Sequence, residues 1–192
     1  MGGAGEGVRV VFLGPPGSGK GTQAQLLAGD LELPAISTGD MLREAVANGS
    51  ELGRRVRKIM ESGELVGDDL MAEVVGERLS HADTERGFLL DGYPRTASQA
   101  ETLLRILVEG SDTLDHVVFI DVPEDELVRR ALLRQRVDDR EDVVRERLRV
   151  YRERTQPLVE YYRSQGLLRE IDGNREVEAV RRAILDALGV DG

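Results

Sequence analysis

The residues best suited to chemistry stand in a glycine-rich segment near the N-terminus. Residues 14–22 read G-P-P-G-S-G-K-G-T, between an apolar run and a stretch of helix-forming residues. Glycines let backbone N–H groups converge on phosphate oxygens, and the N-terminus of a following helix favours negative charge. Lys20 would add a mobile positive charge. The strict motif has Ser or Thr directly after the lysine, whereas here Gly21 precedes Thr22. The segment still predicts a phosphate-binding loop rather than an ordinary glycine-rich turn.

A second set of candidates consists of one aspartate and several arginines. Asp91 ends an apolar run, where a carboxylate can hold the hydration shell of Mg²⁺. Arg95 follows at the same expected strand end, where open α/β sheets bind ligands. Guanidinium groups match phosphate oxygens with two hydrogen bonds and keep their charge. The candidate phosphate clamps are Arg43, Arg95, Arg134, Arg136 and Arg147. Most of the chain's other arginines are expected to be solvated surface charges.

The helical stretch 141–164 places one of these arginines. Its apolar stripe comprises Val144, Leu148, Tyr151, Thr155, Leu158 and Tyr162. At about 100° per residue, Arg147 falls on the edge of the stripe, so it should face inward or toward a cleft. Arg145 and Arg149 are predicted to be plain surface charges. Pro157 is expected to kink this helix.

Composition excludes several other kinds of chemistry. The chain has no cysteine, which excludes disulfides, a thiol nucleophile and a cysteine-ligated zinc site, and its two histidines lie far apart. The net charge of −10 disfavours non-specific binding to nucleic acid or to anionic membranes. No apolar run approaches the ~20 residues of a membrane helix. Residues 1–7 lack the order of a signal peptide, so we expect a flexible tail and a cytoplasmic location.

Strands and helices are predicted to alternate along the chain from residue 8. Strands are expected at 8–13, 34–37, 87–91, 116–122 and 167–171, and helices at 20–31, 39–48, 50–61, 68–81, 96–109, 124–134, 141–164 and 175–188. Near-continuous apolar strands separated by helices indicate a parallel sheet covered on both faces. Right-handed crossovers would make it a doubly wound α/β sheet. The stretch 38–66 has helices but no strand and is predicted to stand away from the sheet.

Several motifs together resemble the signatures of the adenylate kinase family. They are G-P-P-G-S-G-K-G-T-Q at 14–23, S-T-G-D-M-L-R at 37–43 and G-F-L-L-D-G-Y-P-R-T at 87–96, while R-V-D-D at 136–139 followed by Arg147 is similar to the family's lid. The resemblance covers essentially the whole chain from Val8. It implies a five-stranded sheet of the P-loop NTPase type in a single kinase domain, 8–192. Within that domain it implies a helical AMP-binding insertion at 37–66 and a short lid at about 133–143.

The resemblance also implies roles for individual residues. ATP would be bound by Gly17, Ser18, Gly19, Lys20, Gly21, Thr22, Arg134, Gly173 and Arg175. AMP would be bound by Thr38, Arg43, Glu64, Leu65, Val66, Gly92, Tyr93, Pro94, Arg95, Gln99, Arg136 and Arg147. The catalytic residues would be Lys20, Arg95, Arg136 and Arg147. Asp138 and Asp139 would orient lid arginines, and Thr22 with Asp91 would hold Mg²⁺ through water.

The lid departs from the family's usual pattern at two positions. Gln135 stands where the short lid often has glycine, and Arg140 replaces a commonly small or polar residue. Neither change removes a charged clamp, although both affect the lid's hinge and contacts. The longer, zinc-bearing form of the lid is absent, so no zinc is expected.

The reaction that the resemblance implies is the reversible transfer of the γ-phosphoryl group of ATP to AMP, giving two ADP. The acceptor is a phosphate dianion, so in-line alignment and charge neutralisation would suffice without a general base. A UMP/CMP kinase on the same fold is an alternative, which Thr38 and Gln99 fit less well. A non-kinase nucleotide-binding switch is another, although it would need no ring of arginines around a second phosphate site. A monomer is expected.

Overall fold

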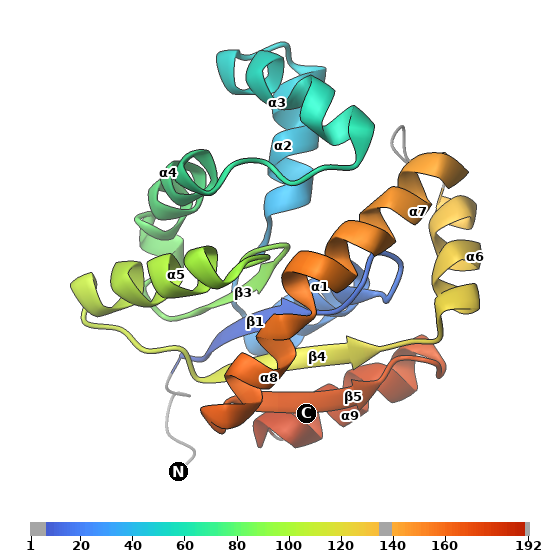
Figure 1. Ribbon diagram of the computed structural model, residues 1–192. Helices are drawn as coiled ribbons and strands as arrows, with labels where there is room; N and C mark the ends of the chain where they lie inside the picture. Colours follow the sequence, from blue (N-terminus) through green and yellow to red (C-terminus); the bar gives the residue numbers. More distant parts are fainter. Residues whose placement is uncertain (1–6, 135–139, 191–192) are drawn as a thin grey trace.

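The computed structural model describes residues 7–134 and 140–190. At its centre lies one parallel sheet with the spatial order β2-β3-β1-β4-β5 (Figure 1). The strands are β1 (Arg9–Leu13), β2 (Ala35–Ser37), β3 (Phe88–Asp91), β4 (His116–Asp121) and β5 (Leu168–Asp172). The predicted five-stranded parallel sheet is therefore confirmed.

Both faces of the sheet are buried, which is why its strands are almost continuously apolar. Val11 and Leu90 belong to one hydrophobic core, whereas Val10 and Leu89 belong to the other, because successive strand residues point to opposite faces. The first core is completed by α4 (Asp68–Leu79), α5 (Ala97–Glu109) and α8 (Pro157–Ser164). The second is completed by α1 (Lys20–Leu31), α6 (Glu124–Arg134), α7 (Glu141–Val150) and α9 (Val177–Leu188). Helices on both faces make the sheet doubly wound, as predicted.

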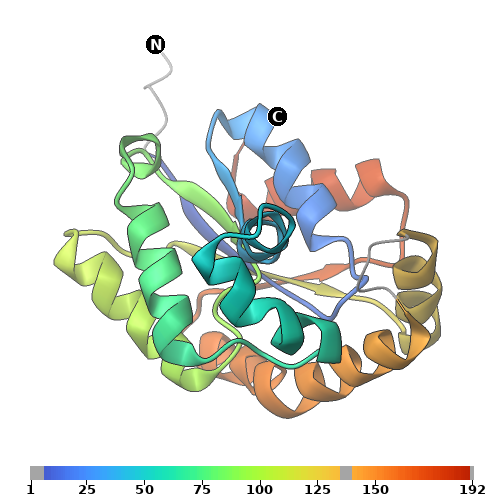
Figure 2. The same ribbon diagram turned by 90° about the horizontal axis from the view of Figure 1, so that it is seen from above.

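Two helices without a strand between them stand above the rest of the molecule in Figure 1 and overlie it in Figure 2. These are α2 (Thr38–Ala47) and α3 (Glu51–Ser62), which pack against each other. The hydroxyl oxygens of Ser37 and Ser50 cap them, accepting from backbone N–H groups three residues ahead at 3.3 and 3.1 Å. They account for most of the stretch 38–66. A 3₁₀ turn at Ala82–Thr84 follows α4.

The prediction of one kinked helix over 141–164 is wrong in detail. A π-helical turn, η2 (Tyr151–Thr155), separates α7 from α8, and the N–H of Gln156 donates to the carbonyl of Tyr151 at 2.9 Å. Pro157 is the first residue of α8, a position that needs no N–H donor. The expected stripe nevertheless stays inward: Val144, Leu148, Thr155, Leu158 and Tyr162 are buried, and Tyr151 is partly buried and lines a cavity.

Within the described residues, no helix combines the length and the apolar character that crossing a membrane requires.

Candidate active site

The candidate site residues gather where the strands end. Because the strands are parallel, their carboxyl ends share one edge of the sheet. The phosphate loop follows β1, Thr38 follows β2, Arg95 lies just after β3, and Gly173 follows β5. Residues from all these segments line a cavity of ≈ 1010 Å³. A smaller cavity of ≈ 60 Å³ lies between α2, the residues after α3, and α5, and shares part of its lining with the large one.

The phosphate loop has the strand–turn–helix setting that the sequence predicted. Gly17 has a φ of +90°, and a Cβ there would lie 2.6 Å from the carbonyl oxygen of Leu127, so only glycine fits. Gly19, with a φ of +95°, precedes α1 as its N-cap. No side chain of the described residues caps α1, and its first turn carries no acidic residue. The N-terminus of α1 is therefore available to an anion.

Lys20 lies among positive charges at the start of α1. Its Nζ donates to the carbonyl oxygen of Pro15 at 3.0 Å. The pKa of Lys20 is lowered from 10.5 to about 8, mainly by burial; Asp91 opposes this shift, and nearby guanidinium groups contribute to it. These guanidinium groups belong to Arg95, Arg147 and Arg134. A chain with a net charge of −10 thus concentrates positive charge in its cavity, which favours a polyanionic ligand.

Three of the predicted phosphate clamps, Arg43, Arg95 and Arg147, line both cavities. Arg43 comes from α2 and forms an ion pair with Asp40 at 2.5 Å. Arg147 comes from α7 and is partly buried. Three segments distant in the sequence therefore bring guanidinium groups to the boundary between the two cavities.

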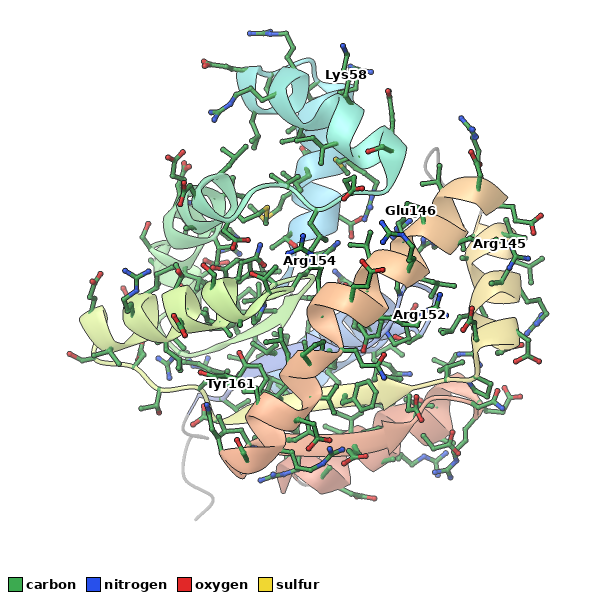
Figure 3. All side chains as sticks on the ribbon, in the orientation of Figure 1. Lys58, Arg145, Glu146, Arg152, Arg154 and Tyr161 are labelled. Atoms are coloured by element: carbon green, nitrogen blue, oxygen red, sulfur yellow. The ribbon has the colours of Figure 1, made fainter. Side chains whose placement is uncertain are left out.

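The prediction about the faces of α7 is confirmed. Arg147 lines the cavities, whereas Arg145 points away from the body of the molecule (Figure 3). Arg145 is exposed and pairs with Glu141 at 2.8 Å. Arg149 is also exposed and pairs with Glu146 at 2.6 Å. These surface pairs lie on the side of the helix away from the apolar stripe.

Arg95 is held in place through its side chain and its backbone. Its Nε donates to the carbonyl oxygen of Gly92 at 2.7 Å, and its N–H donates to Oε1 of Gln99 at 2.8 Å. The hydroxyl of Thr155, on the π-helical turn, donates to the carbonyl oxygen of Arg95 at 2.9 Å. Gly92 itself has a φ of +89°, and a Cβ there would lie 2.5 Å from Oγ1 of Thr38. The irregular turn η2 thus brings Thr155 to the backbone of this arginine.

The small cavity collects most of the residues expected to bind AMP. Its lining includes Thr38, Arg43, Glu64, Leu65, Val66, Gly92, Arg95, Gln99 and Arg147, while Pro94 lines the large cavity. Tyr93 is the exception, because its side chain is 1% exposed, belongs to the hydrophobic core and lines neither cavity. Burial raises the pKa of the Tyr93 hydroxyl to about 12. The structure therefore places the Tyr93 side chain in the hydrophobic core, outside the lining of either cavity.

The residues expected to bind ATP line the large cavity. They are Gly17, Ser18, Gly19, Lys20, Gly21, Thr22, Arg134, Gly173 and Arg175. Arg136, Asp138 and Asp139, with Gln135, lie outside the described residues.

Two oxygen groups in the large cavity suit a hydrated magnesium ion. Asp91 ends β3 and Thr22 lies in the first turn of α1, and both line the cavity. Gly21 directly precedes Thr22, and a Cβ on Gly21 would lie 3.4 Å from Oδ2 of Asp91. The carboxylate of Asp91 therefore lies close to the first turn of α1. The described residues contain no group of three or more His, Cys, Asp or Glu side chains arranged to hold a metal. One carboxylate and one hydroxyl fit Mg²⁺, which keeps several of its own waters.

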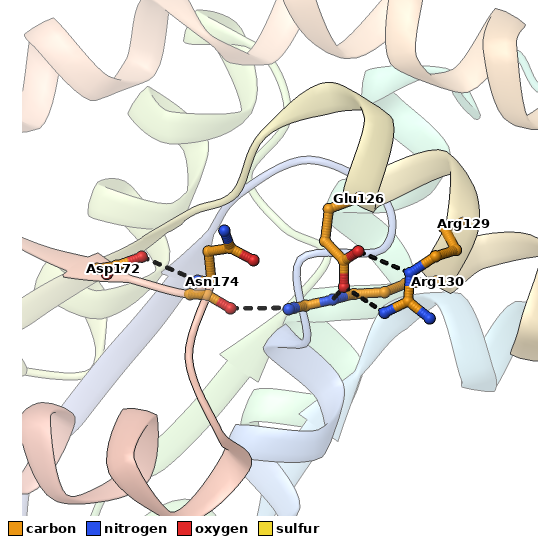
Figure 4. A network of polar contacts seen from close by, with 6 residues as sticks. Glu126, Arg129, Arg130, Asp172 and Asn174 are labelled. Carbon is orange, nitrogen blue, oxygen red and sulfur yellow. Dashed lines mark hydrogen bonds and ion pairs between the residues drawn. The ribbon is translucent and has the colours of Figure 1, made fainter.

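The sequence analysis did not identify two arginines of α6, Arg129 and Arg130, that line the large cavity. Both contact Glu126 (Figure 4). Arg130 donates from Nε to Glu126 at 2.6 Å and from Nη1 to the carbonyl oxygen of Gly173 at 3.0 Å. Arg129 also pairs with Glu126, and the hydrogen bonds from the two guanidinium groups lower the pKa of Glu126 to about 2. Arg130 lies one helical turn before Arg134, so helical spacing was the signal that could have found it.

Gln23 is a further cavity residue that the sequence analysis did not assign. Its side chain is buried, and its Nε2 donates to the carbonyl oxygen of Val177 at 2.9 Å. This bond ties α1 to the start of α9 beside Gly173 and Arg175.

A parallel sheet whose first strand runs through a G-x-x-x-x-G-K loop into a helix defines the P-loop class of nucleotide-binding proteins, and Gly14 to Lys20 have this pattern. Residues 12–167 match the family model described as adenylate kinase. The adenylate kinase of Thermus thermophilus is 52% identical over 96% of this chain and 98% of the relative. The adenylate kinases of Nocardia farcinica and Archaeoglobus fulgidus are 49% and 43% identical, over 95% and 92% of this chain and 99% and 96% of the relatives. The chain belongs to the adenylate kinase family.

Proposed function

We propose that this protein transfers the γ-phosphoryl group of ATP to AMP, reversibly and directly, to give two ADP. The observation that carries this proposal is the set of arginines that line both cavities, Arg43, Arg95 and Arg147. A nucleotide switch needs one phosphate site, whereas these arginines lie between the phosphate loop and a second pocket. Family membership supports the same reaction.

The phosphate loop and Lys20 would hold the triphosphate of ATP in the large cavity, and Arg43 with Arg95 would hold the phosphate of AMP. Arg147 would then contact the phosphoryl group in transit, where negative charge spreads over its equatorial oxygens. The acceptor oxygen is already anionic, so these residues position and neutralise charge and take no proton. Arg136 is assigned the same task by the sequence alone.

Magnesium is the proposed metal, held through water by Thr22 and Asp91. When bound, it would neutralise charge on the ATP phosphates. The chain has no cysteine, so a cysteine-ligated zinc site is excluded.

Gln99 is the proposed contact for the adenine of AMP. It lines the small cavity with 2% of its side chain exposed. Its amide could match both a donor and an acceptor on the edge of a base. A mismatched base would leave buried amide groups unpaired, at a cost of about 1–3 kcal/mol.

The site must exclude water, because otherwise ATP would be hydrolysed. We propose that the segment 37–66 closes over AMP and that the short lid at about 133–143 closes over ATP. The protein would act as a monomer in the cytoplasm.

A coupled assay of ADP formation tests this proposal, with ATP and each of AMP, GMP, CMP and UMP in turn. We expect rapid ADP formation with AMP, much slower turnover with the other monophosphates, and little hydrolysis without any of them. Equal turnover of AMP and UMP would instead indicate a pyrimidine nucleotide kinase. Slow ATP hydrolysis that AMP does not accelerate would indicate a switch.

A further inference from the structure

We propose that Asp68 is a positioning residue that fixes the orientation of the Gln99 amide and thereby sets which monophosphate the small cavity accepts. This inference rests on the proposed contact between Gln99 and the base of AMP. Asp68 is the first residue of α4, is separated from the segment 37–66 by Gly67, and does not line either cavity. It would therefore act through Gln99 and not by touching the nucleotide.

The contacts form a chain from Asp68 to Arg95. Oδ1 of Asp68 accepts from Nε2 of Gln99 at 2.8 Å. Oε1 of Gln99 accepts from the backbone N–H of Arg95 at 2.8 Å. The hydroxyl of Thr96, the N-cap of α5, donates to Asp68 at 3.2 Å and accepts from the N–H of Gln99 at 3.2 Å. The carboxylate of Asp68 thus holds the side chains of both Thr96 and Gln99 at the start of α5.

The chemistry of the two end groups determines which way the amide points. An ionised carboxylate only accepts hydrogen bonds, and a backbone N–H only donates them. The amide nitrogen of Gln99 must therefore face Asp68, and its oxygen must face Arg95. The opposite orientation would place donor against donor and acceptor against acceptor in a buried setting, where unmade hydrogen bonds are costly.

The fixed orientation leaves a defined pattern for the ligand. The Gln99 amide has two N–H donors and two acceptor lone pairs, and each neighbour uses one. One donor and one acceptor remain, in an order that Asp68 and the N–H of Arg95 fix together. Without the carboxylate, only the N–H of Arg95 would still hold the amide, and an amide held at one end can turn and adapt to more than one base edge. Loss of the carboxylate should therefore relax base selectivity, and it should also loosen the backbone of Arg95.

The decisive measurement is the ratio of kcat/KM for AMP to kcat/KM for CMP. Asp68→Leu keeps the approximate size of the side chain and removes the acceptor, so we expect the ratio to fall ~10-fold. Asp68→Asn should keep the ratio within about twofold, because its carbonyl can accept from Gln99 while its amide donates to Thr96. Asp69→Leu is the matched control, since it removes an exposed carboxylate from the same helical turn and should leave the ratio unchanged.

A double-mutant cycle separates this role from a structural one. With Gln99→Ala in place, Asp68→Leu should change the ratio no further, whereas independent effects would add. If Gln99→Ala lowers the ratio and Asp68→Leu does not, the role assigned to Asp68 is wrong. If Gln99→Ala itself leaves the ratio unchanged, the proposed base contact fails instead.

A second pair of variants does not depend on the folding of Asp68→Leu. Gln99→Glu places a second carboxylate beside that of Asp68, so that two acceptors face each other, and it should lower kcat/KM for AMP. Adding Asp68→Asn supplies a donor and should restore part of that loss. No restoration would contradict the proposed polarity of the chain.

Discussion

The phosphate loop and the arginine cluster of Arg43, Arg95 and Arg147 line the same large cavity but are built in contrasting ways. The loop is a continuous segment, 14–22, whose backbone and helix N-terminus face the cavity around one lysine. The cluster consists of single side chains from α2, the turn after β3, and α7. A site made from contiguous backbone depends on glycine conformation, whereas a site made from separate side chains depends on what holds each one. Disturbing the two parts should therefore have effects of different size and kind.

The largest effect is expected from Lys20→Ala. This change removes the loop's one charged side chain beside the proposed phosphates, so phosphoryl transfer should fall by on the order of 10² or more. The fold should persist, as judged by circular dichroism. Lys58→Ala is the matched control, because Lys58 is exposed on α3 (Figure 3). Near wild-type turnover by the folded Lys20→Ala protein would contradict the proposed role of Lys20 in phosphoryl transfer.

A strong effect on the cluster is expected from Arg147→Lys. The charge remains but the two-pronged guanidinium is lost, so kcat should fall by about tenfold or more while KM for ATP and AMP changes less. Arg145→Lys, on the exposed face of α7, should change neither constant. Steady-state kinetics would contradict the assignment if Arg147→Lys raised KM with kcat unchanged, or if the two variants behaved alike. The sequence predicts the same result for Arg136→Lys.

The pH dependence should report the positive surroundings of Lys20. Its pKa is lowered to about 8, so the free enzyme loses this charge as pH rises through 8. Because kcat/KM reports ionisations of the free enzyme, kcat/KM for ATP should fall by about tenfold per pH unit above that value. Bound phosphate charge favours the protonated lysine, so kcat should fall only at higher pH. A level kcat/KM up to pH ~9.5 would show that this lysine keeps its proton.

The smallest effect is expected from Thr155→Val. The change keeps the side-chain shape and removes the hydrogen bond to the Arg95 carbonyl, which should cost about 0.5–1.5 kcal/mol of stability. Looser positioning of Arg95 should also lower kcat by a few-fold. Thr102→Val on α5 is the control, because it loses only a hydrogen bond from Arg105 at the surface. A lower Tm with unchanged kcat would restrict Thr155 to a structural role.

Features that depend on local chemistry were predictable from the sequence. The strands, the phosphate loop and most helices depend on neighbouring residues and on regular periodicity, and the structure reproduces them to within about two residues, as such boundaries allow. The inward position of Arg147 followed from helical geometry in the same way. The π-helical turn could not be predicted in this way, because a stripe of apolar residues at three- and four-residue spacing fits an interrupted helix as well as a continuous one.

What the sequence by itself determined is the nucleotide-binding class, because the phosphate loop is contiguous and its glycines act through their own backbone. What only the tertiary structure decided is which separate side chains meet. Thr155 donates a hydrogen bond to the backbone of Arg95, and Arg130 donates one to the backbone of Gly173. Tyr93 is buried in a core that several segments build. Each of these contacts joins segments far apart in the chain. Asp68 likewise reaches Gln99 across 31 residues. Such pairings arise when helices pack on a sheet, and no local pattern encodes them.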